Sequence, residues 1–496
     1  MRTKLLAWAA ALALAAAAQA APQPQPPFDE FFFDKAWRID FYHMGDAKSE
    51  SFVLRRIAEE GAWPEPKAAL LPPFDYGRYV CRVYDAASNR LIFSRGFDTM
   101  FGEYKTTSPA LAGSVRVFER SLRVPAPRRP VLFVIEQRDK RNLLHPVFNQ
   151  SIDPADYHIL REPPAQGDWI YEARVAGDPH DAVDLVFLAE GYAAADRDKF
   201  RADVDRMAAF LFSVEPYKAL KARFSVRGVF RDSPERGMDE PRQRSYRKTV
   251  LDASFNAFDL DRYMLVEADH RMHEMAGQVP YDILAVLVNS PRYGGGSIGL
   301  DYCVSTVDHA ASPQVFVHEL GHSFAYLADE YYDSEVSYND FYPKGIEPLE
   351  PNITALLDPA RVKWQDLLSP GIGIPTEYGK ARMEALRAEL RAGQEAKARA
   401  LEAARGKNAP AGEIQAIEAR AKAAEDELGK KMAELKAAVM DPLADKVGVF
   451  EGAGYASKGL YRPMIHCIMI SSPKNEFCRV CQRAIARMID FLSGRG

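Results

Sequence analysis

The first third of the chain alternates apolar and polar residues in a way that predicts β-strands. Short runs with an apolar residue at every second position recur from Trp37 to about Gln150, and Gly, Pro, Asn and Asp separate them. A period of two is typical of an antiparallel sheet or a β-sandwich. Because no catalytic set of residues occurs within these runs, we predict a β-rich accessory domain of sandwich-like fold over residues 37–165.

The rest of the chain combines apolar runs with helical periodicity. Residues 182–192 indicate a buried strand that ends in a glycine turn, and a helix is predicted over residues 194–213. Two further strands are predicted over residues 223–230 and 281–290. We therefore expect an α+β protein, with a second domain over residues 166–496.

The segment at residues 290–299 (SPRYGGGSIG) follows the last of these strands. Its three consecutive glycines allow the backbone to lie close to another extended chain, or they belong to a flexible loop. Both interpretations are open on these residues alone.

Residues 376–440 differ sharply in composition, because Ala, Glu, Lys and Arg dominate them. The sequence GKNAPAG at residues 406–412 interrupts the run, and apolar residues recur at helical spacing on both sides. We predict an antiparallel helical hairpin with roughly 25 to 30 residues in each arm, about 40 Å long at 1.5 Å per residue. We expect it to be an insertion in the second domain, and a solvated hairpin without chemistry is the favoured interpretation.

The N-terminal residues have the features of an export signal. Arg2 and Lys4 precede an apolar run that ends in the small residues before Ala20. This run is shorter than the roughly 20 residues that a membrane-spanning helix needs. We therefore predict a signal peptide over residues 1–20, cleavage after Ala20, and a mature protein that is secreted or periplasmic. A proline-rich lead-in is expected over residues 21–36.

The charge balance argues against nucleic acid or a membrane surface as a partner. The chain has 64 basic and 69 acidic residues, which gives a net charge of -5. Neither sign is in sufficient excess to hold the chain against phosphate groups or anionic lipid. No later stretch is apolar enough to cross a bilayer, so we expect no membrane span in the mature chain.

The cysteines allow two kinds of cross-link. Export makes disulfides available, and an odd number of cysteines leaves at least one thiol outside any intramolecular pair. Cys478 and Cys481 have the CxxC spacing of zinc ligands, but only Cys467 lies nearby and a second CxxC does not occur, so a structural zinc site is the weaker interpretation. The five cysteines are Cys81, Cys303, Cys467, Cys478 and Cys481.

The segment HELGH at residues 318–322 carries the chemistry. Positions four apart lie on one face of a helix, so His318 and His322 can direct two imidazoles at one ion. In HExxH zinc enzymes the adjacent glutamate, here Glu319, holds and deprotonates the activated water. The apolar sequence PQVFV before the motif would bury the helix, and this makes a chance pair of histidines on a surface less plausible. We predict one catalytic Zn²⁺ here.

A catalytic zinc of this kind needs a third protein ligand. An unbroken helix would carry Asp329 about 10 Å beyond His322, too far to share its ion. The chain must therefore turn between residues 323 and 328 for Asp329 or Glu330 to reach the metal. A solvated helix end or a salt bridge is the alternative for these acids. The candidates for the third ligand are His309, Asp329, Glu330 and His466.

Three blocks of the sequence resemble the signature blocks of one metallopeptidase family. They are HELGHSFAYLADEYY at residues 318–332, VGVFEGAGYASKGLYRP at residues 447–463 and CIMISSPKNEFCRVC at residues 467–481. Together with the strand AVDLVFLAEGY, these blocks resemble the bacterial IgA-peptidase family, also called the M64 family. The β-rich N-terminal runs resemble the accessory domain of that family. The resemblance covers most of residues 30–490 and leaves out the helical hairpin.

The resemblance implies a metzincin-like zinc peptidase domain, in which a mixed sheet lies over the zinc-binding helix and a methionine turn lies under the ion. Met469 matches that turn, and Met464 matches it less well. Metzincins usually have glycine three residues after the second histidine, where this chain has Ala325. The resemblance favours Asp329 as the third ligand, with Glu330 as its rival.

The resemblance also bears on the substrate cleft. It implies that the strand before the zinc-binding helix binds the substrate backbone, which assigns that role to residues 290–299. Tyr455 or Tyr461 would donate a hydrogen bond to the developing oxyanion, although a structural tyrosine is the favoured interpretation. A disulfide between Cys467 and either Cys478 or Cys481 is expected to hold the loop of the methionine turn, with its connectivity open.

The activity that these features predict is that of a zinc-dependent endopeptidase acting on proteins or peptides. One alternative is an exported binding or adhesion protein with a vestigial metal site, and another is a metal-dependent hydrolase of a non-peptide amide. The family name suggests immunoglobulin A as a substrate, but no residue in the chain selects that protein.

Overall fold

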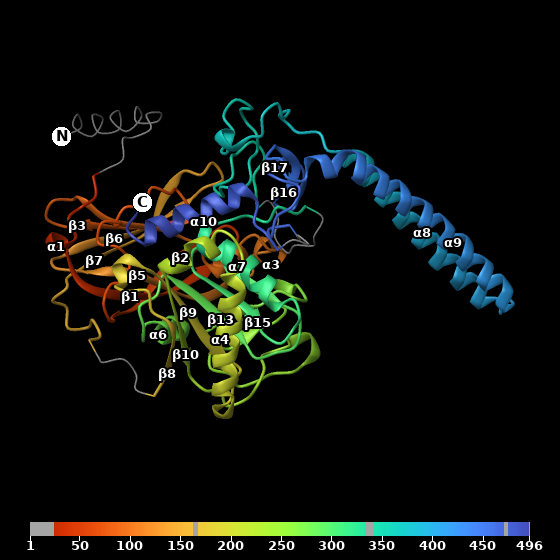
Figure 1. The fold of residues 1–496 in the computed structure, drawn as a ribbon. Helices are drawn as coiled ribbons and strands as arrows, with labels where there is room; N and C mark the ends of the chain where they lie inside the picture. Colours follow the sequence, from red (N-terminus) through yellow and green to blue (C-terminus); the bar gives the residue numbers. More distant parts are fainter. Residues whose placement is uncertain (1–23, 162–166, 333–340, 471–474, 496) are drawn as a thin grey trace.

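The computed structural model describes residues 24–161, 167–332, 341–470 and 475–495. The predicted signal peptide lies outside these ranges. Figure 1 shows a body of sheets and helices from which one helical hairpin projects. The fold is mixed α and β, with β-rich sheets near the N-terminus and a domain of sheet and helices after them.

The N-terminal region forms two antiparallel sheets, as the alternating pattern predicts. One sheet has three strands in the order β2-β1-β5, and the other has four in the order β4-β3-β6-β7. Apolar side chains of both sheets share one buried core, where Phe41 stacks on Phe133 with 5.7 Å between ring centroids. The strands are β1 (Phe32–Gly45), β2 (Glu50–Glu59), β3 (Tyr79–Asp85), β4 (Leu91–Phe97), β5 (Arg116–Pro127), β6 (Val131–Arg138) and β7 (Leu144–Ile152). The short helices are α1 (Phe28–Phe31), α2 (Met100–Tyr104) and α3 (Ser108–Leu111).

The second region is built on a six-stranded mixed sheet with the order β14-β15-β13-β9-β10-β8. The four central strands are parallel, and the strand at each edge runs antiparallel to its neighbour. Three of the predicted strands appear here as β9 (Val183–Glu190), β10 (Phe224–Phe230) and β13 (Ile283–Val288). The others are β8 (Trp169–Arg174), β14 (Gly295–Ile298) and β15 (Tyr302–Thr306).

The two faces of this sheet are covered by different parts of the chain. Side chains alternate along β9, so Phe187 faces the core formed by α4 (Arg197–Leu211), α7 (Ser312–Ala325) and α10 (Arg479–Leu492). Leu188 faces the other way, toward α6 (Asp269–Ala276) and toward α2 and β5 of the N-terminal region. The N-terminal region therefore packs directly, through α2 and β5, on the domain that carries HELGH.

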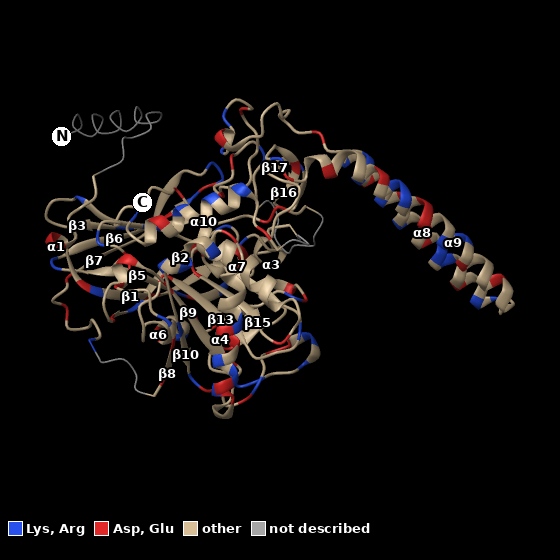
Figure 2. Cartoon of the chain, in the orientation of Figure 1, with Lys and Arg blue, Asp and Glu red and all other residues tan. Residues whose placement is uncertain are grey.

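The predicted helical hairpin is present as α8 (Lys380–Gly406) and α9 (Ala411–Leu435). The arms have 27 and 25 residues, within the predicted range. Basic and acidic residues are interspersed along both arms, as Figure 2 shows. Within the described part of the chain, no helix is both long and apolar enough to cross a membrane. The remaining helix is α5 (Tyr217–Leu220), and the remaining strands are β11 (Ala253–Ser254), β12 (Leu265–Val266), β16 (Phe450–Ala453) and β17 (Ala456–Arg462).

Candidate metal centre

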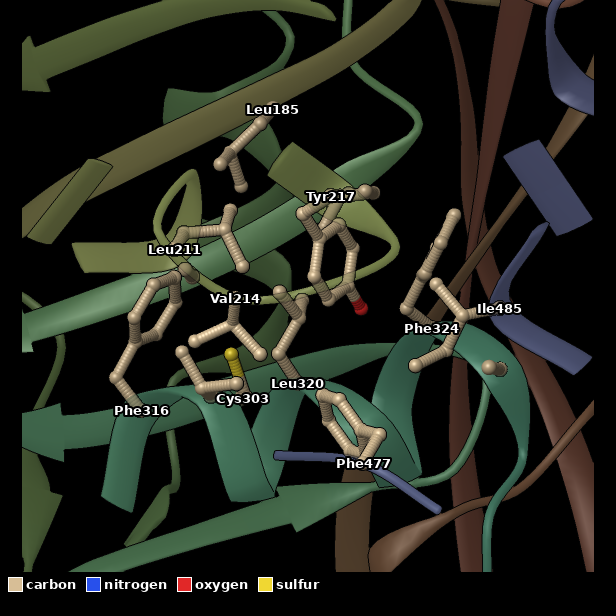
Figure 3. Close-up of a cluster of buried hydrophobic side chains, with 14 of the residues drawn as sticks. Leu185, Leu211, Val214, Tyr217, Cys303, Phe316, Leu320, Phe324, Phe477 and Ile485 are labelled. Atoms are coloured by element: carbon tan, nitrogen blue, oxygen red, sulfur yellow. The ribbon is translucent and has the colours of Figure 1, made fainter. Parts of the chain in front are cut away.

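Helix α7 holds the HELGH segment against the mixed sheet. Proline in its first turn is well tolerated, because the N–H that proline lacks has no partner at that position of a helix. Apolar residues at helical spacing anchor one face of α7 in the core, and this turns the two histidines toward the opposite side. Figure 3 shows the anchors, which are Phe316, Leu320 and Phe324.

Three ligand-type atoms meet at the end of this helix. The Nε2 atoms of His318 and His322 lie 3.2 Å apart. Asp329 Oδ1 lies 3.1 Å from the first and 3.4 Å from the second. Ligands about 2.0 to 2.1 Å from one ion at the tetrahedral angle are separated by about 3.3 to 3.4 Å. The triangle therefore has the size of one face of a zinc coordination sphere.

The hydrogen bonds behind the histidines determine which nitrogen faces the triangle. His318 Nδ1 lies 3.0 Å from the carbonyl oxygen of Ile468, and His322 Nδ1 lies 2.6 Å from that of Leu327. A carbonyl oxygen only accepts, so each Nδ1 donates and each neutral ring presents a lone pair at Nε2. Apart from these two imidazoles, the buried Asp329 Oδ1 has no hydrogen-bond partner. Three lone pairs directed at one point fit a bound cation.

The pKa shifts of the three residues also indicate that the triangle favours a bound positive charge. Burial raises the pKa of Asp329, but the two imidazoles lower it by more, to far below its usual value. For His322, burial lowers the pKa and the Asp329 carboxylate overcomes this, so the pKa is raised to about 9. The pKa of His318 is also raised, by Asp329 against the effect of burial. A proton or a metal ion satisfies this group of ligands.

The chain turns toward Asp329 at Tyr326, within the interval that the spacing predicts. Helix α7 ends at Ala325, and Tyr326 adopts the left-handed conformation with φ of 54°. This conformation favours glycine, so contacts must hold the tyrosine in it. The ring of Tyr326 stacks on Tyr76 at 5.5 Å, and its hydroxyl donates to Asp98 at 3.2 Å. The N-terminal region thus supports the turn that brings the Asp329 carboxylate to the two imidazoles.

Glu319 lies beside the triangle and lines the same cleft. Its Oε2 accepts a hydrogen bond of 2.9 Å from the hydroxyl of Ser297 on β14. That contact orients the carboxylate, which is one residue from His318 on the helix. Glu319 therefore lies next to the three ligand-type atoms, in the position of the glutamate of an HExxH motif.

Met469 lies beneath the histidine-bearing turn of α7. A Cβ atom added to Gly321, between the two histidines, would lie 2.9 Å from the sulfur of Met469, which is fully buried. The segment of Met469 also holds the centre through its backbone, because Glu330 N–H donates to the Met469 carbonyl at 2.8 Å. Met464 belongs to the same core but is not the residue under Gly321.

The other candidate ligands lie elsewhere. Glu330 faces away from the triangle, and its Oε1 lies 3.1 Å from the sulfur of Cys481. His309 belongs to the turn before α7, where its Nδ1 accepts a hydrogen bond from the Ala311 N–H. Neither His309 nor His466 is among the described groups whose ligand atoms cluster. The structure therefore brings together His318, His322 and Asp329.

The cysteines carry free thiols in the structure, in contrast to the expected disulfide. Cys467 and Cys481 are neighbours, but their sulfur atoms are 3.8 Å apart, far beyond the roughly 2.05 Å of a disulfide bond. Cys478 packs beside them. The resemblance correctly placed these residues close to each other, but no bond joins them.

A cleft of about 1250 Å³ opens over the triangle. It exceeds the roughly 300 to 1000 Å³ of most small-molecule sites. Asp98 and Glu103 of the N-terminal region contribute to its wall, although no sequence motif indicated either residue. Tyr455 also lines the cleft, and its hydroxyl donates to the Asp329 carboxylate. Tyr461 is not one of the lining residues.

The glycines of residues 290–299 accommodate the protein's own chain. A Cβ atom at Gly296 would lie 2.1 Å from the Met264 carbonyl oxygen, and one at Gly295 would lie 2.4 Å from Val315. The Gly295 carbonyl accepts a hydrogen bond of 3.2 Å from the Met264 N–H. Part of the outer edge of β14 is thus already paired. Binding of a substrate backbone along this edge stays a prediction.

Together, the HExxH helix, the adjacent carboxylate, the converging third ligand and the cleft are typical of a metallopeptidase. Comparison with protein families agrees with this class. A family model described as IgA Peptidase M64 matches residues 172–489, and one described as Peptidase M64 N-terminus matches residues 27–149. The chain belongs to the IgA peptidase M64 family. No curated protein sequence matches it. Family membership makes the chain a peptidase, a hydrolase whose substrates are proteins or peptides.

Proposed function

We propose that this protein is a zinc-dependent endopeptidase. The observation that carries the proposal is the triangle of His318 Nε2, His322 Nε2 and Asp329 Oδ1, with sides of 3.1 to 3.4 Å. Three protein ligands leave one position open for water or substrate, as in catalytic zinc sites. The nitrogen and oxygen donors suit zinc.

Several residues of the chain would have separate roles in peptide hydrolysis. When bound, zinc supplies Lewis acidity that polarises the scissile carbonyl and lowers the pKa of water. Glu319 accepts a proton from the attacking water and passes it to the leaving amine. Ser297 keeps the Glu319 carboxylate oriented through its 2.9 Å hydrogen bond. Tyr455 lines the cleft, and its hydroxyl would leave Asp329 to donate a hydrogen bond to the developing oxyanion.

The arrangement of elements supports a metzincin-like domain. A mixed sheet with an antiparallel edge strand, β14, packs against α7, and Met469 lies under the histidines. The two N-terminal sheets with their common core fit a β-sandwich-like accessory domain. We place the division between the domains near residue 165. The accessory domain shapes the cleft through Asp98 and Glu103.

We also propose that the protein is exported and acts outside the cytoplasm, on the basis of the basic and apolar N-terminus. Expression of the full chain in a host with an export pathway tests this. N-terminal sequencing of the protein recovered outside the cytoplasm should begin at Ala21. An intact N-terminus in the cytosol would contradict it.

The activity is tested with a mixed peptide library and product analysis by mass spectrometry. The mature protein should cleave internal peptide bonds, and a zinc chelator should stop cleavage until zinc is restored. Glu319→Gln should reduce cleavage by about 10²- to 10⁴-fold, the usual contribution of a general base, and its zinc content should stay unchanged. Glu395→Gln on the exposed hairpin is the matched control. Full activity in Glu319→Gln would reject the mechanism.

A further inference from the structure

A second group of metal-ligand atoms lies behind the catalytic triangle. Within the described residues, the thiols of Cys467, Cys478 and Cys481 and the carboxylate of Glu330 have ligand atoms within 4.8 Å of one another. All four side chains are buried, and Glu330 is 0% exposed. These residues do not take part in the proposed hydrolysis. We propose that they form a second, structural metal site of the zinc type, with three thiolates and one carboxylate.

The distances in this group suit one tetrahedral ion. Two sulfurs about 2.3 Å from zinc are separated by about 3.8 Å at the tetrahedral angle, and a sulfur and an oxygen by about 3.6 Å. The Cys467 and Cys481 sulfurs are 3.8 Å apart. Glu330 Oε1 lies 3.6 Å from the Cys478 sulfur and 3.1 Å from the Cys481 sulfur. The group therefore has the dimensions of a closed four-ligand site.

The carboxylate of Glu330 supports the proposal independently of the cysteines. Its Oε2 is buried without a hydrogen-bond partner, although an unpaired buried carboxylate oxygen is costly. Glu190 provides the contrast, because it is equally buried. Its oxygens accept from the Thr249 hydroxyl and from the N–H groups of Leu251 and Ala253. Glu330 Oε1 accepts a hydrogen bond of 3.0 Å from the Asn352 side-chain amide, but its Oε2 has no donor, and a cation would complete its environment.

Backbone groups are in place to stabilise thiolates. The Cys478 N–H donates to the Cys467 sulfur at 3.2 Å, and the Cys481 N–H donates to the Cys478 sulfur at 3.4 Å. Cys478 is also the N-cap of α10, where the helix dipole favours negative charge. Binding would release the thiol protons to solvent and leave three thiolates on the ion.

The second site would hold the catalytic centre in place. Glu330 follows Asp329 directly, and Cys467 precedes Ile468, whose carbonyl accepts from His318 at 3.0 Å. Cys478 and Cys481 anchor the start of α10, which packs on α7. One buried ion would thus join the segment of the third ligand, the methionine segment and the C-terminal helix. Its role is positioning, because it has no contact with the cleft.

Metal content separates the two sites. The purified mature protein, exchanged into metal-free buffer, should hold two zinc ions per chain by plasma mass spectrometry. The double variant His318→Ala/His322→Ala should keep one. Its zinc absorption fine structure should show a sulfur-dominated shell near about 2.3 Å. Its cobalt-loaded form should show thiolate-to-cobalt charge-transfer absorption. A folded double variant that holds no metal would overturn the proposal without affecting the assignment of the catalytic site.

Matched single variants test the ligands. Glu330→Gln should lose one zinc per chain and retain the other, whereas Glu190→Gln should retain both. Cys481→Ala should also lose one zinc, whereas Cys303→Ala, at a buried thiol outside the group, should lose none.

If a ligand variant fails to fold, thiol labelling of the wild type tests the proposal instead. After denaturation in chelator without reductant, all five cysteines should be alkylated. A disulfide among Cys467, Cys478 and Cys481 would overturn the proposal.

Discussion

Two adjacent residues, Asp329 and Glu330, face two different metal-ligand clusters. Asp329 joins two imidazoles at a cleft, where its triangle has an open side. Glu330 joins three thiols in a closed and fully buried cluster. An open site with nitrogen and oxygen donors suits catalysis, and a closed site rich in sulfur suits structure. Under the two proposals, solvent access and the number of protein ligands separate the two roles, even for neighbouring carboxylates.

A third cluster shows that residue type alone is insufficient. Asp269, His273 and Asp301 also bring ligand atoms together. The guanidinium of Arg120, however, pairs with Asp301 and lies 3.7 Å from Asp269. The protein supplies the positive charge here, so a metal ion would be repelled. Burial raises the pKa of Asp269 well above its usual value, with Asp301 adding to the effect.

The largest effect is expected from a substitution in the open site of His318, His322 and Asp329. Asp329→Asn removes an anionic ligand, and loss of several kcal/mol of transition-state stabilisation corresponds to about 10³-fold in kcat/KM. We expect this variant to stay folded and to lose one zinc, as judged by circular dichroism, peptide cleavage and metal content. Glu330→Gln should instead lower Tm, whereas the activity per folded molecule should change much less. The same outcome for both variants would remove the distinction between the two sites.

The next largest effect is expected in the cluster of Asp269, His273 and Asp301, where Arg120 supplies the positive charge. Arg120→Met removes the guanidinium that pairs with Asp301 and Asp269 and leaves His273, 3.0 Å from Asp301, as their neighbour. Breaking a buried ion pair in this way typically costs about 3 to 5 kcal/mol. We expect a correspondingly lower midpoint in urea unfolding, with metal content unchanged. A variant as stable as the wild type would show that the guanidinium is dispensable and that this cluster remains open to a metal ion.

A smaller effect concerns Glu190, the buried carboxylate with hydrogen-bond donors. Burial raises its pKa from 4.5 to about 6, against the hydrogen bonds from Thr249, Ala253 and Leu251. The folded state therefore binds the proton more tightly than the unfolded state. The resulting stabilisation is present below about pH 4.5 and is lost as pH rises through about 6, which amounts to about 2 kcal/mol.

Urea unfolding of wild type and Glu190→Gln across this pH range measures the contribution. The variant should lack this component of the pH dependence, so its stability relative to wild type should increase as pH rises from about 4.5 to 6. A constant difference between the two proteins would show that Glu190 has an ordinary pKa. Glu190 would then no longer serve as the buried carboxylate against which Glu330 is compared.

The smallest effect is expected at the hairpin. Its distal half is exposed, and its ion pairs, such as Lys397 with Glu425 at 3.5 Å, are of the surface kind that contributes little. Replacing residues 392–424 by a short Gly-Ser linker should leave kcat/KM on a short peptide within about twofold and both metals in place. A large loss on the short peptide would show that the hairpin contributes to the open site.

Local pattern was sufficient for much of the fold. Strands β1, β3, β9 and β13 fall where alternation or an apolar run predicts them, and both hairpin helices fall within the predicted segment. The pairing of His318 and His322 also follows from spacing, since helical periodicity alone brings them together. The turn before Asp329 was predicted from the reach of the chain, although the residue that makes it was not.

Local periodicity specifies the helices and strands and the helical face that carries the two histidines and Glu319, because it depends only on residues close in the chain. The remaining features depend on contacts between distant segments. Tyr326 adopts its left-handed conformation through contacts with Tyr76 and Asp98, which lie more than 200 residues away in the chain. Glu330 meets three cysteines about 140 to 150 residues distant. No local pattern encodes this packing of distant segments, and it is the reason that Asp329 and the adjacent Glu330 lie in different clusters.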